Sequence, residues 1–488
     1  MENQDKKPNI IAIIGAIVLL VLAVVGLSYA FFSAFIKNGE TDPSIEGTGA
    51  NLSLVYTDGK SVITSSNIMP GWSATKTFTV TNNGEADTYY KLNISNITNE
   101  FVDGGLTFSI ASADGGTSVA EQAVGTTTRT ISPSITIAEG ATHTYTVTAK
   151  YINLNTDQTP DLGKSFSYTI GIEASQKPTF KDIILANNEV KTPITTPGAA
   201  VSTSSEALLA SAEDDYGTSY YFRGAVTNNY VEFANKCWRI VRIGGDNTVK
   251  LILHNDNISN ASNPCSSANN STTAAFVHYD GNIYKSEFNS NYNDNAYVGF
   301  MYGTPGSTTY EATHANTNKS TILTNLETWY NNNLKTYESV IDNNVFCNDK
   351  SLSSESGYSA NATDYAARER LYTSKIPSLK CNGELSKITS KIGLITADEL
   401  AFAGYAVRGY ITTSYLKENA TGYSWWSLSP AGFYNKSLSY VFRVRSDNDA
   451  IDICNVNVDS SVRQVISLVS SITISGVSGT SEDPYVVK

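Results

Sequence analysis

The sequence contains few of the residues that build catalytic or metal sites. Only four of its 488 residues are histidine, and none of them forms an HExxH or HxxxH pair. The chain also lacks a GxSxG turn and a glycine-rich phosphate loop followed by lysine. These absences disfavour an enzyme, so we predict no catalytic residue, no metal site and no cofactor. Aspartate-rich loops at 291–295 and 446–452 offer oxygens to calcium, but a solvated loop is the simpler interpretation of each.

Charge is also scarce, because only 16% of the residues are charged. The 34 Lys and Arg residues against 46 Asp and Glu residues give a net charge of −12. An acidic surface repels phosphate backbones, so we expect no nucleic-acid partner. Tyrosine is abundant instead, with 29 residues. It offers apolar area and a hydroxyl group at little entropic cost, which suits an extracellular contact surface.

Cysteine is limited to five residues, all in the carboxyl-terminal half. No CxxC pair or zinc spacing occurs among them. Outside the cytoplasm cysteines oxidise in pairs, and an odd number leaves at least one unpaired or used between molecules. Cys347 and Cys381 flank a polar insert, so we predict a disulfide between them. Cys237 lies in an apolar, strand-like run and is predicted to be a buried thiol.

Long hydrophobic runs are absent except for one, between Lys7 and Lys37. It is long enough to cross a bilayer, which needs roughly 20 apolar residues. Because basic residues that precede such a run stay in the cytoplasm, we expect residues 1–38 to form a cytoplasmic tail and one membrane helix. The rest of the chain is then extracellular. Residues that mark this predicted helix are Ile10, Leu19, Val24 and Phe32.

The same run is also compatible with a cleaved secretion signal. Ser28 and Ala30 are small residues at the two positions that a signal peptidase reads, so cleavage after Ala30 would release the chain. One observation argues against cleavage: the apolar run is longer than the apolar core of an ordinary signal peptide, which has about 7–15 residues. Both alternatives place the remainder outside the cytoplasm.

Residues 46–175 alternate between apolar and polar side chains. Phe78 and Val80 alternate with threonine, as do Tyr145 and Val147, and the runs are separated by glycine-containing turns. Strands that recur without a helical period predict an antiparallel β-sandwich.

The remaining sequence divides into a linker and a second domain. Residues 180–190 predict a short helix, and the Pro/Thr/Ser-rich stretch after it leads us to assign 176–212 as a linker. Residues 213–488 mix strand-like runs with a helical period at 322–337. Thr396 and Glu399 form a capping box before a second helix. The fold class is therefore multidomain: a transmembrane helix, a β-sandwich and an α+β domain.

Both extracellular parts resemble known families. The Met69-Pro70-Gly71 turn followed by KTFTVTNNGEADTYYKLNIS resembles the Ig-like sandwich modules of Gram-positive surface and matrix proteins of the TasA/camelysin type. The order of DDYGTSYYFRGAVTNNYVEFANKCWRIVRI, FNSNYNDNAYVGFMYG, IGLITADELAFAG and YSWWSLSP resembles a domain of unknown function in Firmicutes surface proteins. That domain is similar to the C-type-lectin-like fold of formylglycine-generating enzymes. The family has Gly-Val-Arg-Pro where this chain has Ser461-Val462-Arg463-Gln464.

The late aromatic residues form the candidate ligand surface. In the lectin-like fold that the second domain resembles, the late loops carry the ligand face. One Trp of an adjacent pair on a strand faces away from the other, so one of them could be exposed. The favoured alternative for this pair is that both tryptophans fill the core. The candidate ligand-binding residues are Tyr423, Trp425, Trp426, Phe433 and Tyr434, beside the 446–452 loop.

The expected function is that of a membrane-anchored extracellular surface protein. It would bind a surface protein or a glycan through residues 213–488, the predicted head. The alternative is a structural matrix or pilus-like subunit, released by signal peptidase and assembled through the sandwich. A degenerate enzyme is the least favoured interpretation.

Overall fold

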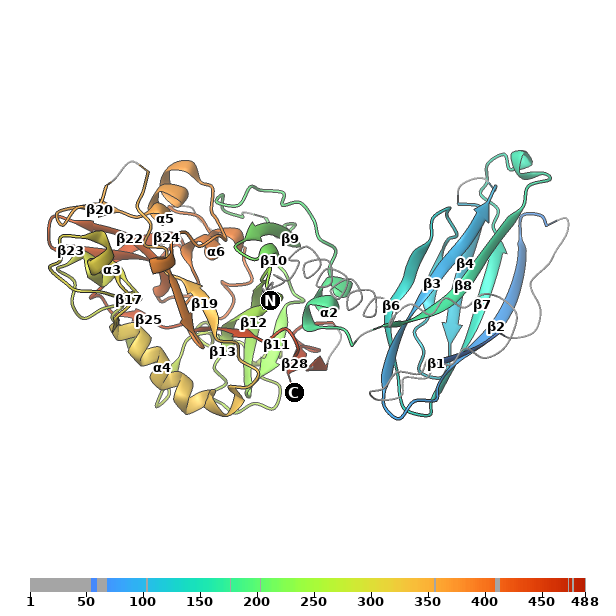
Figure 1. Ribbon diagram of the computed structural model, residues 1–488, viewed down its shortest axis with the longest axis horizontal. Helices are drawn as coiled ribbons and strands as arrows, with labels where there is room; N and C mark the ends of the chain where they lie inside the picture. Colours follow the sequence, from blue (N-terminus) through green and yellow to red (C-terminus); the bar gives the residue numbers. More distant parts are fainter. Residues whose placement is uncertain are drawn as a thin grey trace, which may run out of the picture. The chain divides into compact units, whose positions relative to one another are not determined.

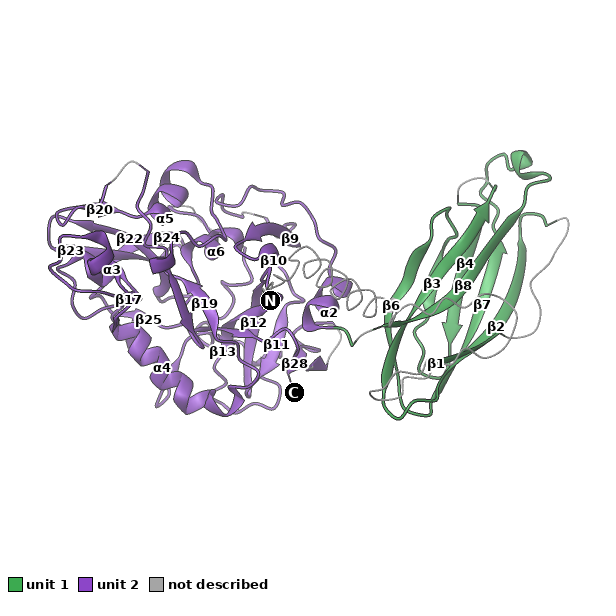
Figure 2. Cartoon of the chain, viewed as in Figure 1, with its two compact units in different colours: residues 1–178 green, residues 179–488 purple. Residues whose placement is uncertain are grey.

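A computed structural model describes residues 54–58, 68–101, 104–175, 177–201, 203–354, 357–408, 413–472, 474–475 and 478–487 (Figure 1). The predicted membrane helix and its cleavage site lie outside these residues. Within the described part of the chain, no helix is both long and apolar enough to span a membrane. The chain divides into two compact units, Met1–Pro178 and Thr179–Lys488 (Figure 2).

Unit 1 consists of two antiparallel β-sheets. The five-stranded sheet has the order β1 (Leu54–Asp58), β2 (Trp72–Asn82), β7 (Thr142–Tyr151), β4 (Leu106–Ser112) and β5 (Val119–Ala123). The three-stranded sheet has the order β6 (Arg129–Ile137), β3 (Thr88–Asn99) and β8 (Phe166–Ser175). The apolar residues of the predicted period-two pattern fill the space between the sheets, among them Phe78, Tyr90, Leu92 and Tyr145. The prediction that this part is built from antiparallel strands is confirmed.

Unit 2 is built around two larger sheets. One has the order β26 (Val465–Leu468), β13 (Val249–Asn255), β12 (Lys236–Ile243), β11 (Tyr230–Phe233), β28 (Tyr485–Val487) and β27 (Ile474–Ser475), and β10 (Gly217–Gly224) joins it to β9 (Ala207–Asp214). The other contains β16 (Lys285–Ser286), β25 (Ser460–Ser461), β22 (Trp425–Tyr434), β23 (Leu438–Val444) and β24 (Ile451–Asn455), with β20 (Thr363–Asp364) beside β22. Three two-stranded ribbons complete the unit: β14 (His278–Tyr279) with β15 (Asn282–Ile283), β17 (Met301–Tyr302) with β18 (Asn318–Lys319), and β19 (Asn344–Cys347) with β21 (Lys387–Ser390).

The helices of unit 2 are short, and their ends follow local signals. They are α2 (Phe180–Asn187), α3 (Tyr310–His314), α4 (Thr321–Asn333), α5 (Ala366–Arg368), continued by a π-helical turn at Glu369–Ser374, and α6 (Ala397–Phe402). The side chain of Thr396 accepts from the backbone N–H of Glu399, and the Glu399 carboxylate accepts from that of Thr396, so the predicted capping box is confirmed. The helix predicted at 322–337 is also present as α4, which begins after the N-cap Ser320.

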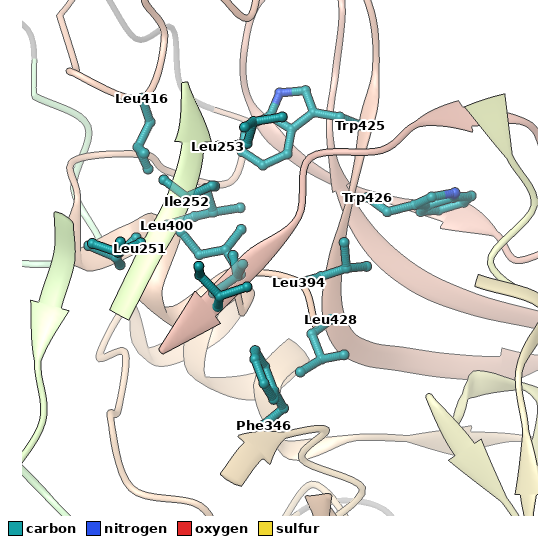
Figure 3. Close-up of a cluster of buried hydrophobic side chains, with 14 of the residues drawn as sticks. Leu251, Ile252, Leu253, Phe346, Leu394, Leu400, Leu416, Trp425, Trp426 and Leu428 are labelled. Carbon is teal, nitrogen blue, oxygen red and sulfur yellow. The ribbon is translucent and has the colours of Figure 1, made fainter. Parts of the chain in front are cut away.

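One continuous core joins the elements of unit 2. Figure 3 shows part of it, where Leu251 and Leu253 of β13 lie near Leu400 of α6 and the two tryptophans of β22. Trp425 and Trp426 are both fully buried. The Trp426 indole N–H donates to the carbonyl of Ser286 at 2.7 Å. The interpretation that one of these tryptophans is exposed is therefore wrong.

The segment predicted to be a linker is largely part of unit 2. Phe180 and Ile184 of α2 are fully buried in the unit 2 core, because they lie on one face of the helix and meet the sheet. Further along, β9 pairs with β10 over eight residue pairs. The assignment of 176–212 as a linker therefore fails from residue 180 onward. The Pro/Thr/Ser composition that suggested it is compatible with an extended segment fixed by backbone hydrogen bonds.

Two disulfides close loops in unit 2. Cys347 is bonded to Cys381, as predicted. Cys237 is bonded to Cys265, so the prediction of a buried thiol at Cys237 is wrong. An apolar strand can bury a disulfide as readily as a thiol, and the sequence does not distinguish the two. Cys454 is the free cysteine among the described residues, and it is buried.

Candidate functional site

A large concavity lies in unit 1, lined by residues of both of its sheets. It is a groove of about 1320 Å³, lined by residues of β1, β2, β7 and β8 and by the loops at their ends. Ligand sites for small molecules usually have about 300–1,000 Å³. The groove is therefore large enough for a chain segment.

A cluster of aromatic side chains lines part of the groove. The Trp72 ring lies 5.9 Å from Phe166, and Phe101 lies 5.6 Å from Phe166 and 4.9 Å from Tyr151, measured between ring centroids. Trp72 and Phe166 are only half-buried, whereas Phe101 and Tyr151 belong to the core. The complete set of aromatic lining residues is Tyr56, Trp72, Phe78, Phe101, Tyr151, Phe166 and Tyr168.

Two strand edges border the groove. Among the described residues, β8 pairs only with β3, and β1 pairs only with β2. The Tyr56 hydroxyl of β1 donates to the carbonyl of Ile170 in β8 at 3.5 Å, so the two edges approach each other there. An edge strand presents backbone N–H and C=O groups that can pair with another strand. The groove thus offers aromatic side chains beside backbone hydrogen-bonding groups.

The groove is lined by charged side chains as well, both exposed and buried. Lys76 forms an ion pair with Asp58 at 2.8 Å, and both side chains are partly exposed. The Tyr151 hydroxyl donates to the buried carboxylate of Asp161 at 2.7 Å. Burial, reinforced by this carboxylate, raises the pKa of Tyr151 to about 12. Tyr151 and Asp161 therefore bond to each other, and the groove surface combines polar and apolar groups.

The residues predicted from the sequence for ligand binding are not brought together in unit 2. Phe433 is only 2% exposed, so it belongs to the core together with Trp425 and Trp426. The β22 strand that carries all three is covered on both faces. Tyr423 is 36% exposed and lies near Phe276 and Lys285. Tyr434 belongs to a different cluster at the other end of β22.

That second cluster alternates tyrosine rings with arginine side chains. Tyr434 lies 5.4 Å from Tyr440, and the Arg368 guanidinium lies 5.2 Å from the Tyr434 ring. On its other side Arg368 is 5.3 Å from Tyr372, which also contacts Arg408 at 5.2 Å. We call these five residues the Arg–Tyr surface. Arg and Tyr are frequent in the residues that carry binding energy at protein interfaces.

The candidate residues taken from the sequence include only Tyr434 of this surface. Arg368 and Tyr372 are four residues apart, the spacing that places two side chains on one face of a helix. That signal could have been recognised. Arg408 is distant in the sequence and carried no signal.

Unit 2 also contains a small charged cavity of about 40 Å³ beside the Cys347–Cys381 disulfide. Glu399 accepts from Lys250 at 2.6 Å and from Arg242 at 2.9 Å. Burial alone would raise the pKa of Glu399, but these two cations lower it to about 2. The cavity holds one or two water-sized groups, and its carboxylates are already bonded to protein donors.

The loops considered for calcium use their carboxylates internally. Asp447 and Asp452 both pair with Arg445, and Asp449 pairs with Lys417 at 2.9 Å. Across the residues that the structure describes, no three His, Cys, Asp or Glu side chains are grouped so that they could hold a metal ion.

Comparison with known proteins adds no relative: no family model matches the chain, and no curated protein matches it significantly.

Proposed function

We propose that the protein is an extracellular surface protein and that the groove of unit 1 binds an extended apolar strand of a partner protein. The groove, with its aromatic side chains and open strand edges, is the observation that carries the proposal. A peptide that adds a strand to a sheet gains main-chain hydrogen bonds from the edge and specificity from alternate side chains. The half-buried rings of Trp72 and Phe166 would receive those side chains.

The sequence supports the extracellular part of the proposal. The apolar run between Lys7 and Lys37 would hold the chain at the membrane or direct its secretion. Two disulfides in unit 2 agree with an oxidising compartment. In this proposal unit 1 is an Ig-like sandwich of the TasA/camelysin type, and unit 2 is a C-type-lectin-like head.

A display library of random peptides tests the proposal. The full-length protein should enrich peptides with apolar residues at alternate positions. Trp72→Ala should bind the enriched peptides at least tenfold more weakly, whereas Tyr89→Ala, a half-buried tyrosine of β3 outside the groove, should bind them normally. If no such pattern is enriched, or if both variants bind equally, the groove is not a strand-binding site.

The Arg–Tyr surface favours a second candidate function, adhesion through unit 2. Its rings and guanidinium groups suit a surface protein or a glycan, because aromatic faces pack on sugar rings and arginine bonds to polar groups. Replacing Arg368 and Tyr434 by alanine should abolish binding in a glycan and surface-protein array. Unchanged array binding would exclude this surface.

A further inference from the structure

Arg463 lies in the interior of unit 2, in the segment 461–464 where the sequence departs from the family that it resembles. Its side chain is fully buried. Nε donates to the carbonyl of Leu253 at 2.7 Å, and Nη1 donates to the carbonyl of Leu416 at 2.6 Å. Both acceptors are neutral. Within the described part of the chain, Nη2 has no hydrogen-bond partner and Arg463 has no carboxylate within ion-pair distance.

Other buried donors near this guanidinium also lack partners. The Trp425 ring centroid is 5.2 Å from Arg463 Cζ, and its indole N–H is unbonded among the described residues. Arg463 Nη1 donates to the carbonyl of Leu416, and Tyr415 is the residue before it in the chain. The Tyr415 hydroxyl is also unbonded among the described residues. Trp425 is fully buried and Tyr415 is 2% exposed. A buried donor without an acceptor costs about 1–3 kcal/mol.

The charges of this region do not balance. Arg239 is a second fully buried guanidinium, and it donates to Glu418 at 2.9 Å. Arg463 and Arg239 carry two positive charges, and Glu418 supplies one negative charge. Burial and the two arginines lower the pKa of His254 well below its usual value, so this neighbour is neutral. One positive charge remains.

Nearby ion pairs do not supply the missing negative charge. Lys417 pairs with Asp449, and Lys236 pairs with Asp256, so each pair is neutral by itself. Burial lowers the pKa of Arg463 to about 10, as expected for a guanidinium that gains little from counter-charges. It still carries its charge at neutral pH. Burying an unpaired charge is costly, and a bound counter-ion removes that cost.

We propose that Arg463 binds a small monovalent anion of chloride size inside unit 2, through its free Nη2 and with the Tyr415 hydroxyl and the Trp425 indole N–H as further donors. All three donors are buried and unbonded among the described residues, Arg463 Cζ lies 5.2 Å from the Trp425 ring, and a single negative charge neutralises the remaining positive charge. An ordered water could accept the same hydrogen bonds, but it would leave the charge unbalanced. The anion would be a structural component of unit 2, independent of the groove in unit 1.

Thermal unfolding of the full-length protein tests the proposal in solution. Chloride is varied against gluconate at constant ionic strength. Because an anion that binds only the folded state stabilises it, Tm should rise with chloride and with bromide. Tyr415→Phe removes one donor and should raise the chloride concentration needed for half of the effect about tenfold. Tyr221→Phe, a buried tyrosine of a separate cluster in unit 2, should behave like the wild type.

Crystals grown in bromide locate the ion directly. An anomalous peak within hydrogen-bonding reach of Arg463 Nη2 is expected. A Tm that does not depend on chloride, or electron density at Nη2 without an anomalous signal, would show that the site holds water and would overturn the proposal. Bromide peaks confined to the protein surface would overturn it as well.

Discussion

Arg223 and Glu206 form an ion pair in which both side chains are completely buried, with Nε and Oε1 2.6 Å apart. Glu206 lies in the segment that the sequence predicts to be a linker, whereas Arg223 lies in β10. The guanidinium also donates to the carbonyls of Ala401 and Phe402, the last two residues of α6. The pair therefore fixes the end of the supposed linker to the interior of unit 2.

Replacing Glu206 by alanine should destabilise unit 2 by about 3–5 kcal/mol, because it leaves a buried guanidinium without its carboxylate. Urea unfolding measures the change. Glu213→Ala, an exposed carboxylate in the neighbouring β9 strand, is the matched control and should cost less than about 0.5 kcal/mol. Equal effects of the two changes would show that the segment around residue 206 is not held in the core.

The burial of the Lys350 ammonium group leads us to expect that the stability of the protein depends on pH. Its buried ammonium group donates to the carbonyls of Met301 and His314 and to Asn316 Oδ1, and burial lowers its pKa to about 7. Between pH 7 and 9.5 the unfolded chain keeps a proton on this group that the folded chain has lost. The free energy of unfolding should therefore rise with pH, by up to about 1.4 kcal/mol per unit.

Denaturant unfolding at several pH values separates this contribution from others. Lys350→Met should remove the rise of the unfolding free energy with pH. Lys335→Met, which replaces an exposed lysine, should retain this rise. A Lys350→Met protein with the same pH dependence as the wild type would show that Lys350 does not titrate in this range.

The burial of the aromatic residues of β22 makes a third prediction. Phe433→Ala should lower stability by about 3–5 kcal/mol through the cavity that it leaves. Tyr423→Ala should change it by less than about 1 kcal/mol, because this ring is 36% exposed. Differential scanning calorimetry of both variants distinguishes the two positions. A larger loss for Tyr423 than for Phe433 would reverse the assignment of core and surface.

Local patterns predicted much of the secondary structure. The alternation around Phe78 and Val80 is a property of one strand, and the Thr396 capping box is a property of one helix end, so each is visible in a short stretch of sequence. The Cys347–Cys381 bridge was likewise predicted from its flanking polar insert. The placement of the segment before residue 213 and the state of Cys237 depend on contacts with distant residues, and both predictions were wrong.

The candidate sites depend on relations that the sequence does not show. From the sequence alone, Trp72 and Phe166 are predicted to be ordinary core residues of a sandwich. The alternation of apolar and polar residues along a strand does not reveal whether two sheets pack against each other along their whole length. Adjacent residues of a strand point to opposite faces, which suggested that one of Trp425 and Trp426 could be exposed, but both faces of β22 are covered. Arg408 joins the Arg–Tyr surface only through the fold.

Hydrogen exchange of the full-length protein with a selected apolar peptide tests the central claim most directly. A strand bound in the groove would pair with an open edge, so backbone amides of β8 (Phe166–Ser175) or of β1 (Leu54–Asp58) should exchange more slowly when the peptide is present. The Trp72→Ala variant should show no such protection. Protection confined to unit 2, or peptide binding that leaves both edges unprotected, would contradict the assignment of the groove.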